Sequence, residues 1–348
     1  MDATVLLILL QDGLVNGAIY ALLGLALVMV FAVTRIIFIP QGEFVTFGAL
    51  TLAFIINGRT PGTLWLLLIA GGLVAIKEII ATLNSASQDK VKRIGWVLIW
   101  AVAWPLVLIV LSPWVMGKNI PLFISVLYAL AVVVPLGPML YRLVYQPLAE
   151  ASVLVLLITS VALHFALTGL GLVFFGAEGW RTPAFMRGQV DFLGMLWSAQ
   201  TLFVLVACAV LIGALWLFFG ATLYGRALRA TAVNRRGARL VGISAHMSGQ
   251  ITLFLAAAVG AFSGMLIAPV TTVYYDTGFL IGLKGFVGAI IGGLASYPIT
   301  AIGAIFVGIL EAFSSFWASQ YKEVIVFTLI IPVLLWRSFG MHIMDDED

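Results

Sequence analysis

The chain has 348 residues, of which 63% are apolar and only 9% are charged, and its formal net charge is +3. Soluble domains average about 45–50% apolar and about 25% charged residues, so this composition excludes a soluble globular protein and indicates a membrane protein. Its single cysteine, Cys208, excludes a disulfide framework and a cysteine-based metal site. The three histidines are widely separated, and no P-loop, H-E-x-x-H or G-x-S-x-G pattern occurs, which argues against an ATPase or hydrolase.

Apolar segments follow one another along nearly the whole chain. A membrane-spanning helix needs about 20 mostly apolar residues. Eleven segments approach that length: 5–33, 41–57, 63–80, 95–113, 120–140, 152–175, 201–220, 249–270, 280–295, 299–318 and 323–338. The first has no basic n-region or small-residue cleavage site, so we expect a retained helix rather than a signal peptide. The fold class predicted is an all-α polytopic bundle of about 10–11 transmembrane helices, with a short or re-entrant, glycine-rich element near 280–295.

The distribution of lysine and arginine predicts the orientation. With the N-terminus outside, twelve basic residues are cytoplasmic: Arg35, Lys77, Lys90, Lys92, Arg93, Arg142, Arg226, Arg229, Arg235, Arg236, Arg239 and Arg337. Five are external: Arg59, Lys118, Arg181, Arg187 and Lys322. The positive-inside rule therefore predicts an N-out, C-in protein, although the C-terminal tail from Asp345 to Asp348 is acidic.

Two hydrophilic interruptions separate apolar segments. The stretch Lys77–Gly95 is expected to be a mobile cytoplasmic loop. The stretch Ala177–Ser198 is external and contains Trp180, Phe185 and Trp197, which suits an interfacial element such as a helix on the membrane surface.

The third interruption is the most basic part of the chain. Gly225–Ile243, with the sequence GRALRATAVNRRGARLVGI, has five arginines and no acidic residue. One arginine in mid-bilayer costs about 2.5–3.5 kcal/mol, so this loop must lie in water. It is either a helix that docks on a cytoplasmic partner or a topology anchor held against anionic lipid. Its alanines favour a helix, and Leu228, Leu240 and Ile243 offer apolar anchors, which favours docking.

Three stretches together resemble the permease subunits of branched-chain amino-acid ABC importers of the LivH type. The first is DGLVNGAIYAL at residues 12–22, followed by Gly42-Glu43-Phe44. The second is the basic loop, and the third is the glycine-rich sequence from Gly282 to Ser315. The matching positions in the second and third are Gly225, Arg226, Ala227, Arg229, Ala230, Ala238, Leu240, Gly242 and Ile243, then Gly282, Lys284, Phe286, Ala289, Gly292, Gly293, Ser296, Gly308, Glu311 and Ala312.

The resemblance covers roughly residues 12–57 and 120–338, and the chain departs from it in two places. Residues 38–41 read Phe-Ile-Pro-Gln where the family usually has Asn-Phe-Ala-His. Residues 61–118 look like an added pair of helices, which leaves the downstream orientation unchanged. The chain is expected to be a single permease domain over residues 1–348, with the coupling loop at 221–248.

The resemblance implies a non-enzymatic permease subunit of the bacterial inner membrane. It implies a second permease subunit, giving a heterodimer, two cytoplasmic ABC ATPases and a periplasmic solute-binding protein, with no nucleic-acid partner. ATP and Mg²⁺ would bind to the ATPases, and this chain would bind no cofactor or metal. The ATPase-coupling residues would be Gly225, Arg226, Arg229, Ala230, Arg235, Arg236, Arg239, Leu240, Gly242 and Ile243.

The few polar residues inside predicted spans are candidates for the solute path or a gate: Glu43, Lys284, Gly292, Gly293 and Glu311. For Glu43 a helix-capping role is favoured over a path role. For Lys284 a structural ion pair with Glu311 or Asp276 is favoured over solute contact or snorkelling. His164 is expected to be a hydrogen-bonded intramembrane histidine. The two glycines permit either close backbone approach or a gate.

The solute implied is a branched-chain or related amino acid, while related permeases carry urea, amides or aromatic acids. A self-contained ion-coupled carrier is a further alternative. That class predicts more intramembrane acids and an internal inverted repeat, neither of which is evident.

Overall fold

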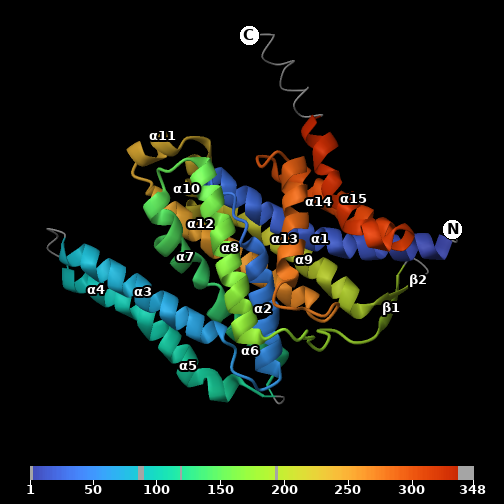
Figure 1. The fold of residues 1–348 in the computed structure, drawn as a ribbon, viewed down its shortest axis with the longest axis horizontal. Coiled ribbons are helices and arrows are strands. Elements are labelled where there is room, and N and C mark those ends of the chain that lie inside the picture. Colours follow the sequence, from blue (N-terminus) through green and yellow to red (C-terminus); the bar gives the residue numbers. More distant parts are fainter. Residues whose placement is uncertain (1–2, 85–89, 118–119, 193–194, 336–348) are drawn as a thin grey trace, which may run out of the picture. The chain divides into compact units, whose positions relative to one another are not determined.

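The computed structural model describes residues 3–84, 90–117, 120–192 and 195–335. Helices make up most of this part of the chain, and one short hairpin interrupts them (Figure 1). The elements are α1 (Ala3–Thr34), α2 (Gln41–Ile56), α3 (Thr63–Leu83), α4 (Lys90–Leu98), η1 (Ile99–Ala103), α5 (Trp104–Val115), α6 (Leu122–Val133), α7 (Leu136–Leu140), η2 (Tyr141–Tyr145), η3 (Gln146–Leu148), α8 (Val153–Phe175), β1 (Gln189–Phe192), β2 (Met195–Ser198), α9 (Ala199–Ala221), α10 (Leu223–Val233), α11 (Arg235–Leu240), α12 (Ala245–Ile267), α13 (Thr277–Ile291), α14 (Tyr297–Trp317), η4 (Ser319–Tyr321) and α15 (Lys322–Thr328).

The helices confirm a multi-pass membrane protein. Within the described ranges, eight helical runs are long and apolar enough to cross a membrane: Thr4–Thr34, Thr63–Leu83, Lys90–Val115, Leu122–Leu148, Val153–Phe175, Ala199–Ala221, Ala245–Ile267 and Tyr297–Trp317. Two further apolar helices, α2 with 16 residues and α13 with 15, are shorter than a hydrocarbon core requires.

One predicted span, and some of the basic residues used to predict the orientation, lie partly or wholly outside the described residues. The segment expected at 323–338 begins in α15 and extends into residues 336–348, which include Arg337 and the acidic tail. Lys118, which the positive-inside rule predicts to be external, is also not among the described residues. The number of 10–11 spans and the N-out, C-in orientation stay predictions.

The described chain falls into two compact units, each assembled from segments far apart in the sequence. Unit 1 comprises Met1–Ala32, Met186–Arg226 and Leu280–Asp348. Unit 2 comprises Val33–Phe185 and Ala227–Phe279. The single permease domain expected over residues 1–348 stays a prediction beside this division.

Small residues let the helices of unit 1 approach closely. A Cβ atom added at Gly17 in α1 would lie 2.7 Å from the Cα atom of Ile305 in α14. One added at Gly288 in α13 would lie 2.7 Å from the Cβ atom of Ala304. Transmembrane helices associate through such contacts because lipid provides no hydrophobic drive between them. This packing explains why glycine is so abundant in apolar segments.

Unit 2 is built around α2, whose residues from Gln41 to Ile55 are all buried. Its main neighbour is α12, and a Cβ atom added at Gly264 of α12 would collide with the backbone of Val45. A helix that is apolar and buried on every side belongs to the interior of a protein rather than to a lipid-facing surface. The short helix α2 is therefore a central element of its unit.

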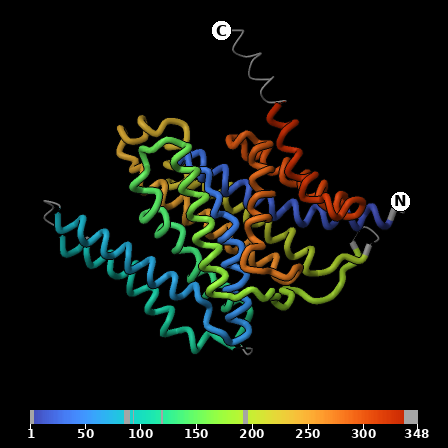
Figure 2. The backbone as a smooth tube through the Cα atoms, in the orientation of Figure 1, coloured from blue at the N-terminus to red at the C-terminus, as the bar shows by residue number. Residues whose placement is uncertain are grey.

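The described residues of the predicted addition, 61–84 and 90–117, form two helical arms in unit 2, drawn in blue to teal (Figures 1 and 2). The first arm is α3, and the second is the continuous run of α4, η1 and α5. Exposed side chains such as Ile69, Leu73 and Ile76 lie along α3, as expected for a lipid-facing helix.

The expectation of a loop over Lys77–Gly95 is wrong for most of its length. Helix α3 continues to Leu83 and α4 begins at Lys90, while residues 85–89 lie outside the described part. The Lys77 ammonium donates to the Arg142 carbonyl oxygen, and the Glu78 carboxylate pairs with the Arg142 guanidinium at 3.2 Å. These partners satisfy the charges of Lys77 and Glu78, two of the residues that suggested a solvated loop.

The surface helix expected within Ala177–Ser198 is also wrong. Strands β1 and β2 pair antiparallel there, so that Val190 faces Trp197 across the ladder. Cross-strand pairs of an aromatic with a β-branched residue stabilise such hairpins. The all-α fold class therefore needs one correction, a two-stranded hairpin before α9.

Candidate functional site

The basic loop folds into two short helices rather than one coupling helix. Asn234 leaves the helical conformation between α10 and α11, and its Oδ1 atom accepts a hydrogen bond from the Gly237 N–H at 2.9 Å. An asparagine in this position caps the new helix and fixes the break. Gly242 then adopts a φ of +87°, a value that favours glycine, and Ser244 caps α12.

Most of the arginines of the loop are exposed. The side chains of Arg226, Arg229, Arg236 and Arg239 all lie at the surface. Arg235 is half-buried, and its Nη1 atom donates to the Ala149 carbonyl oxygen at 3.5 Å. This contact ties α11 to the segment before α8, so the exposed guanidinium groups sit on an ordered support.

The apolar side chains of the loop divide into buried and exposed sets. Leu228 is only 1% exposed, so its predicted role as a docking anchor is wrong. Leu240 is 89% exposed and Ile243 half-buried, while Val233 and Val241 are exposed residues that sequence reasoning missed. Helical spacing could have separated them, because residue 228 lies on a different face of α10 from residues 226, 229 and 233.

We define the coupling surface as the exposed part of this loop, which combines basic and apolar side chains. It comprises Arg226, Arg229, Ala230, Val233, Arg236, Arg239, Leu240 and Val241. Gly225 is buried against Phe218 and Phe219, so it shapes the start of α10 and lies outside this surface.

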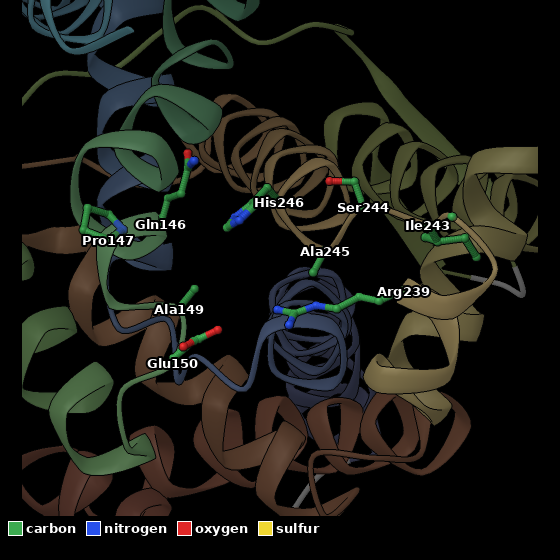
Figure 3. Close-up of a pocket in the computed structure, with 10 residues that line it drawn as sticks. Gln146, Pro147, Ala149, Glu150, Arg239, Ile243, Ser244, Ala245 and His246 are labelled. Atoms are coloured by element: carbon green, nitrogen blue, oxygen red, sulfur yellow. The ribbon is translucent and has the colours of Figure 1, made fainter. Parts of the chain in front are cut away.

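A pocket of about 500 Å³ lies beside the coupling surface (Figure 3). Two segments of unit 2 line it: the residues between η2 and α8, and the stretch from the end of α11 to the start of α12. The lining consists of Gln146, Pro147, Ala149, Glu150, Arg239, Gly242, Ile243, Ser244, Ala245 and His246. Of these residues, only Arg239, Gly242 and Ile243 were predicted as functional from the sequence. Residues 146–150 were missed because they lie almost a hundred positions before the basic loop.

A buried acid–histidine pair lies at the start of α2. The Glu43 side chain is 1% exposed, and its Oε1 atom lies 2.8 Å from the Nδ1 atom of His164 in α8. The His164 ring stacks on Phe279, with ring centroids 4.2 Å apart. Glu43 therefore has a side-chain partner and does not act simply as a helix cap, although its place in the first turn of α2 also suits the helix dipole.

A second buried cluster gathers four side chains of unit 1. The Lys284 ammonium lies 2.5 Å from Glu311 Oε1 and 3.0 Å from Glu323 Oε1. The Tyr20 hydroxyl donates to Glu311 Oε2 at 2.5 Å. The pair of Lys284 with Glu311 was expected, whereas Tyr20 and Glu323 were missed because nothing in the sequence brings α1 and α15 to them. We name this group the Lys284 cluster.

Gly292 and Gly293 mark the end of α13. A Cβ atom added at Gly292 would lie 2.8 Å from the Thr300 nitrogen and would collide with the Thr300 hydroxyl. Gly293 has a φ of +64°. Both glycines allow the chain to turn tightly from α13 into α14, while a gating role for them stays a prediction.

The part of the chain that the structure describes contains no group of three histidine, cysteine, aspartate or glutamate side chains placed to hold a metal ion. The expectation that this chain binds no cofactor stays a prediction.

Comparisons with known proteins match this chain to one transport family. The family model described as branched-chain amino acid transport system / permease component matches residues 9–334. The permease protein BraD of a high-affinity branched-chain amino acid transport system of Pseudomonas aeruginosa is 27% identical over 82% of this chain and 94% of its own length. The corresponding LivH protein of Escherichia coli strain K12 is 27% identical over 82% of this chain and 93% of its own length.

Among solved structures, a chain of PsaBC from Streptococcus pneumoniae in complex with Fab matches with a TM-score of 0.40 and 10% identity. That match covers 93% of this chain and 90% of the other.

Proposed function

Because this chain belongs to the family of permease components of branched-chain amino acid transport systems, we propose that it forms half of the membrane path of an ATP-driven importer. The family membership makes it a transport subunit with several membrane spans. A second permease subunit would complete the path, and two ABC ATPases would supply the energy by binding ATP and Mg²⁺. A periplasmic binding protein would deliver the solute across a bacterial inner membrane.

The observation that carries the proposal is the coupling surface. Its four exposed arginines and three exposed aliphatic side chains suit a partner groove that is acidic at its rim and apolar at its centre. A lipid anchor needs only positive charge. An ordered support, fixed by the Asn234 cap and the contact of Arg235 with Ala149, suits the transmission of motion from a docked ATPase.

The solute proposed is a branched-chain amino acid. Residues 9–334 match the family whose description names that solute, and both BraD and LivH carry it in their names. The buried Glu43–His164 pair and the Lys284 cluster lie in or beside apolar helices, where charged groups are costly and usually serve structure or transport. We assign them first to structure, because each charge already has a partner.

The experiment that tests this proposal is co-purification with the ATPase subunits after charge reversal. The double variant Arg229→Glu/Arg236→Glu should lose ATPase association by at least about 100-fold, since contacts of charged groups contribute about 1.5–3 kcal/mol each. The matched control is Arg187→Glu, an exposed arginine between the β-hairpin and the rest of the external segment. Unchanged ATPase association in the double variant would refute the docking role.

A further inference from the structure

The pocket beside the coupling surface holds two opposite charges that are free of each other. Arg239 reaches into it from the last turn of α11, and Glu150 reaches into it from the segment before α8, and their charged ends point toward one another (Figure 3). Across the described ranges, no hydrogen bond or ion pair is found for the Glu150 carboxylate or the Arg239 guanidinium. The pocket therefore offers one site for an anionic group and one for a cationic group.

The anionic site is reinforced by the start of α12. This helix of 23 residues begins at Ala245, and both Ala245 and His246 line the pocket. A helix N-terminus attracts negative charge through its free N–H groups and its dipole. The Ser244 hydroxyl accepts from the Met247 N–H at 3.3 Å, which holds this terminus in place. A carboxylate next to Arg239 would thus meet both a guanidinium and a helix N-terminus.

The rest of the lining is partly polar and partly aliphatic, since Gln146, Ser244 and His246 also belong to it. Ala149 and Ala245 provide aliphatic surface beside the two charged groups, while Pro147 and Ile243 lie at opposite ends of the pocket (Figure 3). The volume of about 500 Å³ falls in the range of small-molecule sites, which is about 300–1,000 Å³. A phosphate or nucleotide would meet the Glu150 carboxylate, which repels it. A simple fatty chain would leave both charges without partners.

We propose that this pocket binds a free α-amino acid with an aliphatic side chain, and that the bound amino acid inhibits the transporter from its cytoplasmic side. The α-carboxylate lies against Arg239 and the α12 N-terminus, the α-ammonium against Glu150, and the side chain against Ala149 and Ala245. The ligand is therefore chemically the transported product itself, bound outside the membrane path.

Inhibition follows because the two sides of the pocket come from different parts of the chain. Arg239 and Gly242 are part of the basic loop, whereas Glu150 belongs to the segment that leads into α8. A bound zwitterion adds a second tie between these walls, beside the contact of Arg235 with Ala149. The bound amino acid therefore restrains the basic loop, which must move when the ATPases close on ATP. This consequence rests on the proposed function, while the complementarity of the pocket does not.

The test uses the assembled transporter in proteoliposomes with the ATPases facing outward and binding protein with solute enclosed. ATP hydrolysis is measured while leucine is added outside. We expect leucine to lower the stimulated rate at least fivefold at saturation. Three partial ligands, 4-methylpentanoate, 3-methylbutylamine and inorganic phosphate, should each be at least tenfold less potent.

The deciding variant is Glu150→Gln, which removes the carboxylate that binds the ligand's ammonium group. Glu150 is exposed, so the change should not disturb folding. Without added leucine, the variant should hydrolyse ATP within twofold of the unaltered transporter's rate. Its half-inhibitory leucine concentration should be at least tenfold higher. Glu178→Gln, which alters an exposed acid outside the pocket, should change neither value. Full inhibition of Glu150→Gln by leucine would place the inhibitory site in the membrane path and overturn the inference.

Two further outcomes would also overturn it: equal potency of phosphate or 4-methylpentanoate, which indicates a simple anion site, and a stimulated rate that leucine does not alter. A complex without any solute-stimulated ATP hydrolysis would instead contradict the proposed function, so the two failures are distinguishable.

Discussion

Replacing Lys284 by methionine should be among the most destabilising single changes in unit 1. The Lys284 side chain is 6% exposed and lies 2.5 Å from a Glu311 carboxylate that is itself 10% exposed. Methionine keeps most of the side-chain length but removes the charge. Among the described residues, Glu311 then keeps the Tyr20 hydroxyl as its one hydrogen-bond partner, and its charge stays buried.

The magnitude follows from the burial of each partner. Removing one member of a buried ion pair costs about 3–5 kcal/mol, because the other charge is left without compensation. The Glu323 side chain is 33% exposed, so solvent screens its attraction to Lys284. That ion pair therefore contributes about 0–1 kcal/mol. We therefore expect Lys284→Met to lower the free energy of unfolding by about 3–5 kcal/mol and Glu323→Gln by about 1 kcal/mol or less.

Unfolding in mixed micelles, with sodium dodecyl sulfate as denaturant and tryptophan fluorescence as readout, measures these differences. The double variant Lys284→Met/Glu311→Gln serves as the matched control, because it removes the uncompensated charge together with the lysine. It should be more stable than Lys284→Met alone. Equal effects of Lys284→Met and Glu323→Gln, or a double variant less stable than the single one, would refute the argument from burial.

Three further predictions concern helix packing, the Glu43–His164 pair and the support of the coupling surface. Gly71→Ala should weaken the packing of α3 against η1, because its Cβ atom would collide with the Ala101 carbonyl oxygen, whereas Gly72→Ala meets nothing within 4 Å and should be neutral or gain about 0.5–1 kcal/mol in the same unfolding assay. His164→Ala should cost about 3 kcal/mol or more in that assay, and adding Glu43→Gln should recover part of the loss; no recovery would mean that the pair holds no buried charge. Asn234→Ala should cost about 0.5–2 kcal/mol locally and speed amide exchange in α11 relative to α10, and unchanged exchange would contradict its capping role.

Features that depend on composition or on local sequence could be predicted. The run of apolar segments indicated a multi-pass membrane protein, and the glycine-rich stretch near 280–295 indicated a short helix, which is α13. The arginines had to lie in water whatever their fold, because the cost of burying them is large. A resemblance spread over several motifs led to the family that residues 9–334 match.

Features that depend on contacts between distant segments could not be predicted. Glu43 and His164 are 121 positions apart, and Glu311 and Tyr20 are 291 positions apart, so no local pattern joins them. The β-hairpin before α9 was missed because its strands are only four residues long. The charges of Lys77 and Glu78 suggested a loop because their partners, the Arg142 carbonyl and guanidinium groups, come from another helix.

The central claim is that this chain moves solute only when partner ATPases drive it. The most direct measurement is uptake of radiolabelled leucine into proteoliposomes that contain this chain and its permease partner, with and without the ATPase subunits, at saturating ATP and binding protein. The account predicts uptake only when the ATPases and ATP are both present, and loss of uptake in the Arg229→Glu/Arg236→Glu variant. Uptake at an equal rate without the ATPases would contradict it.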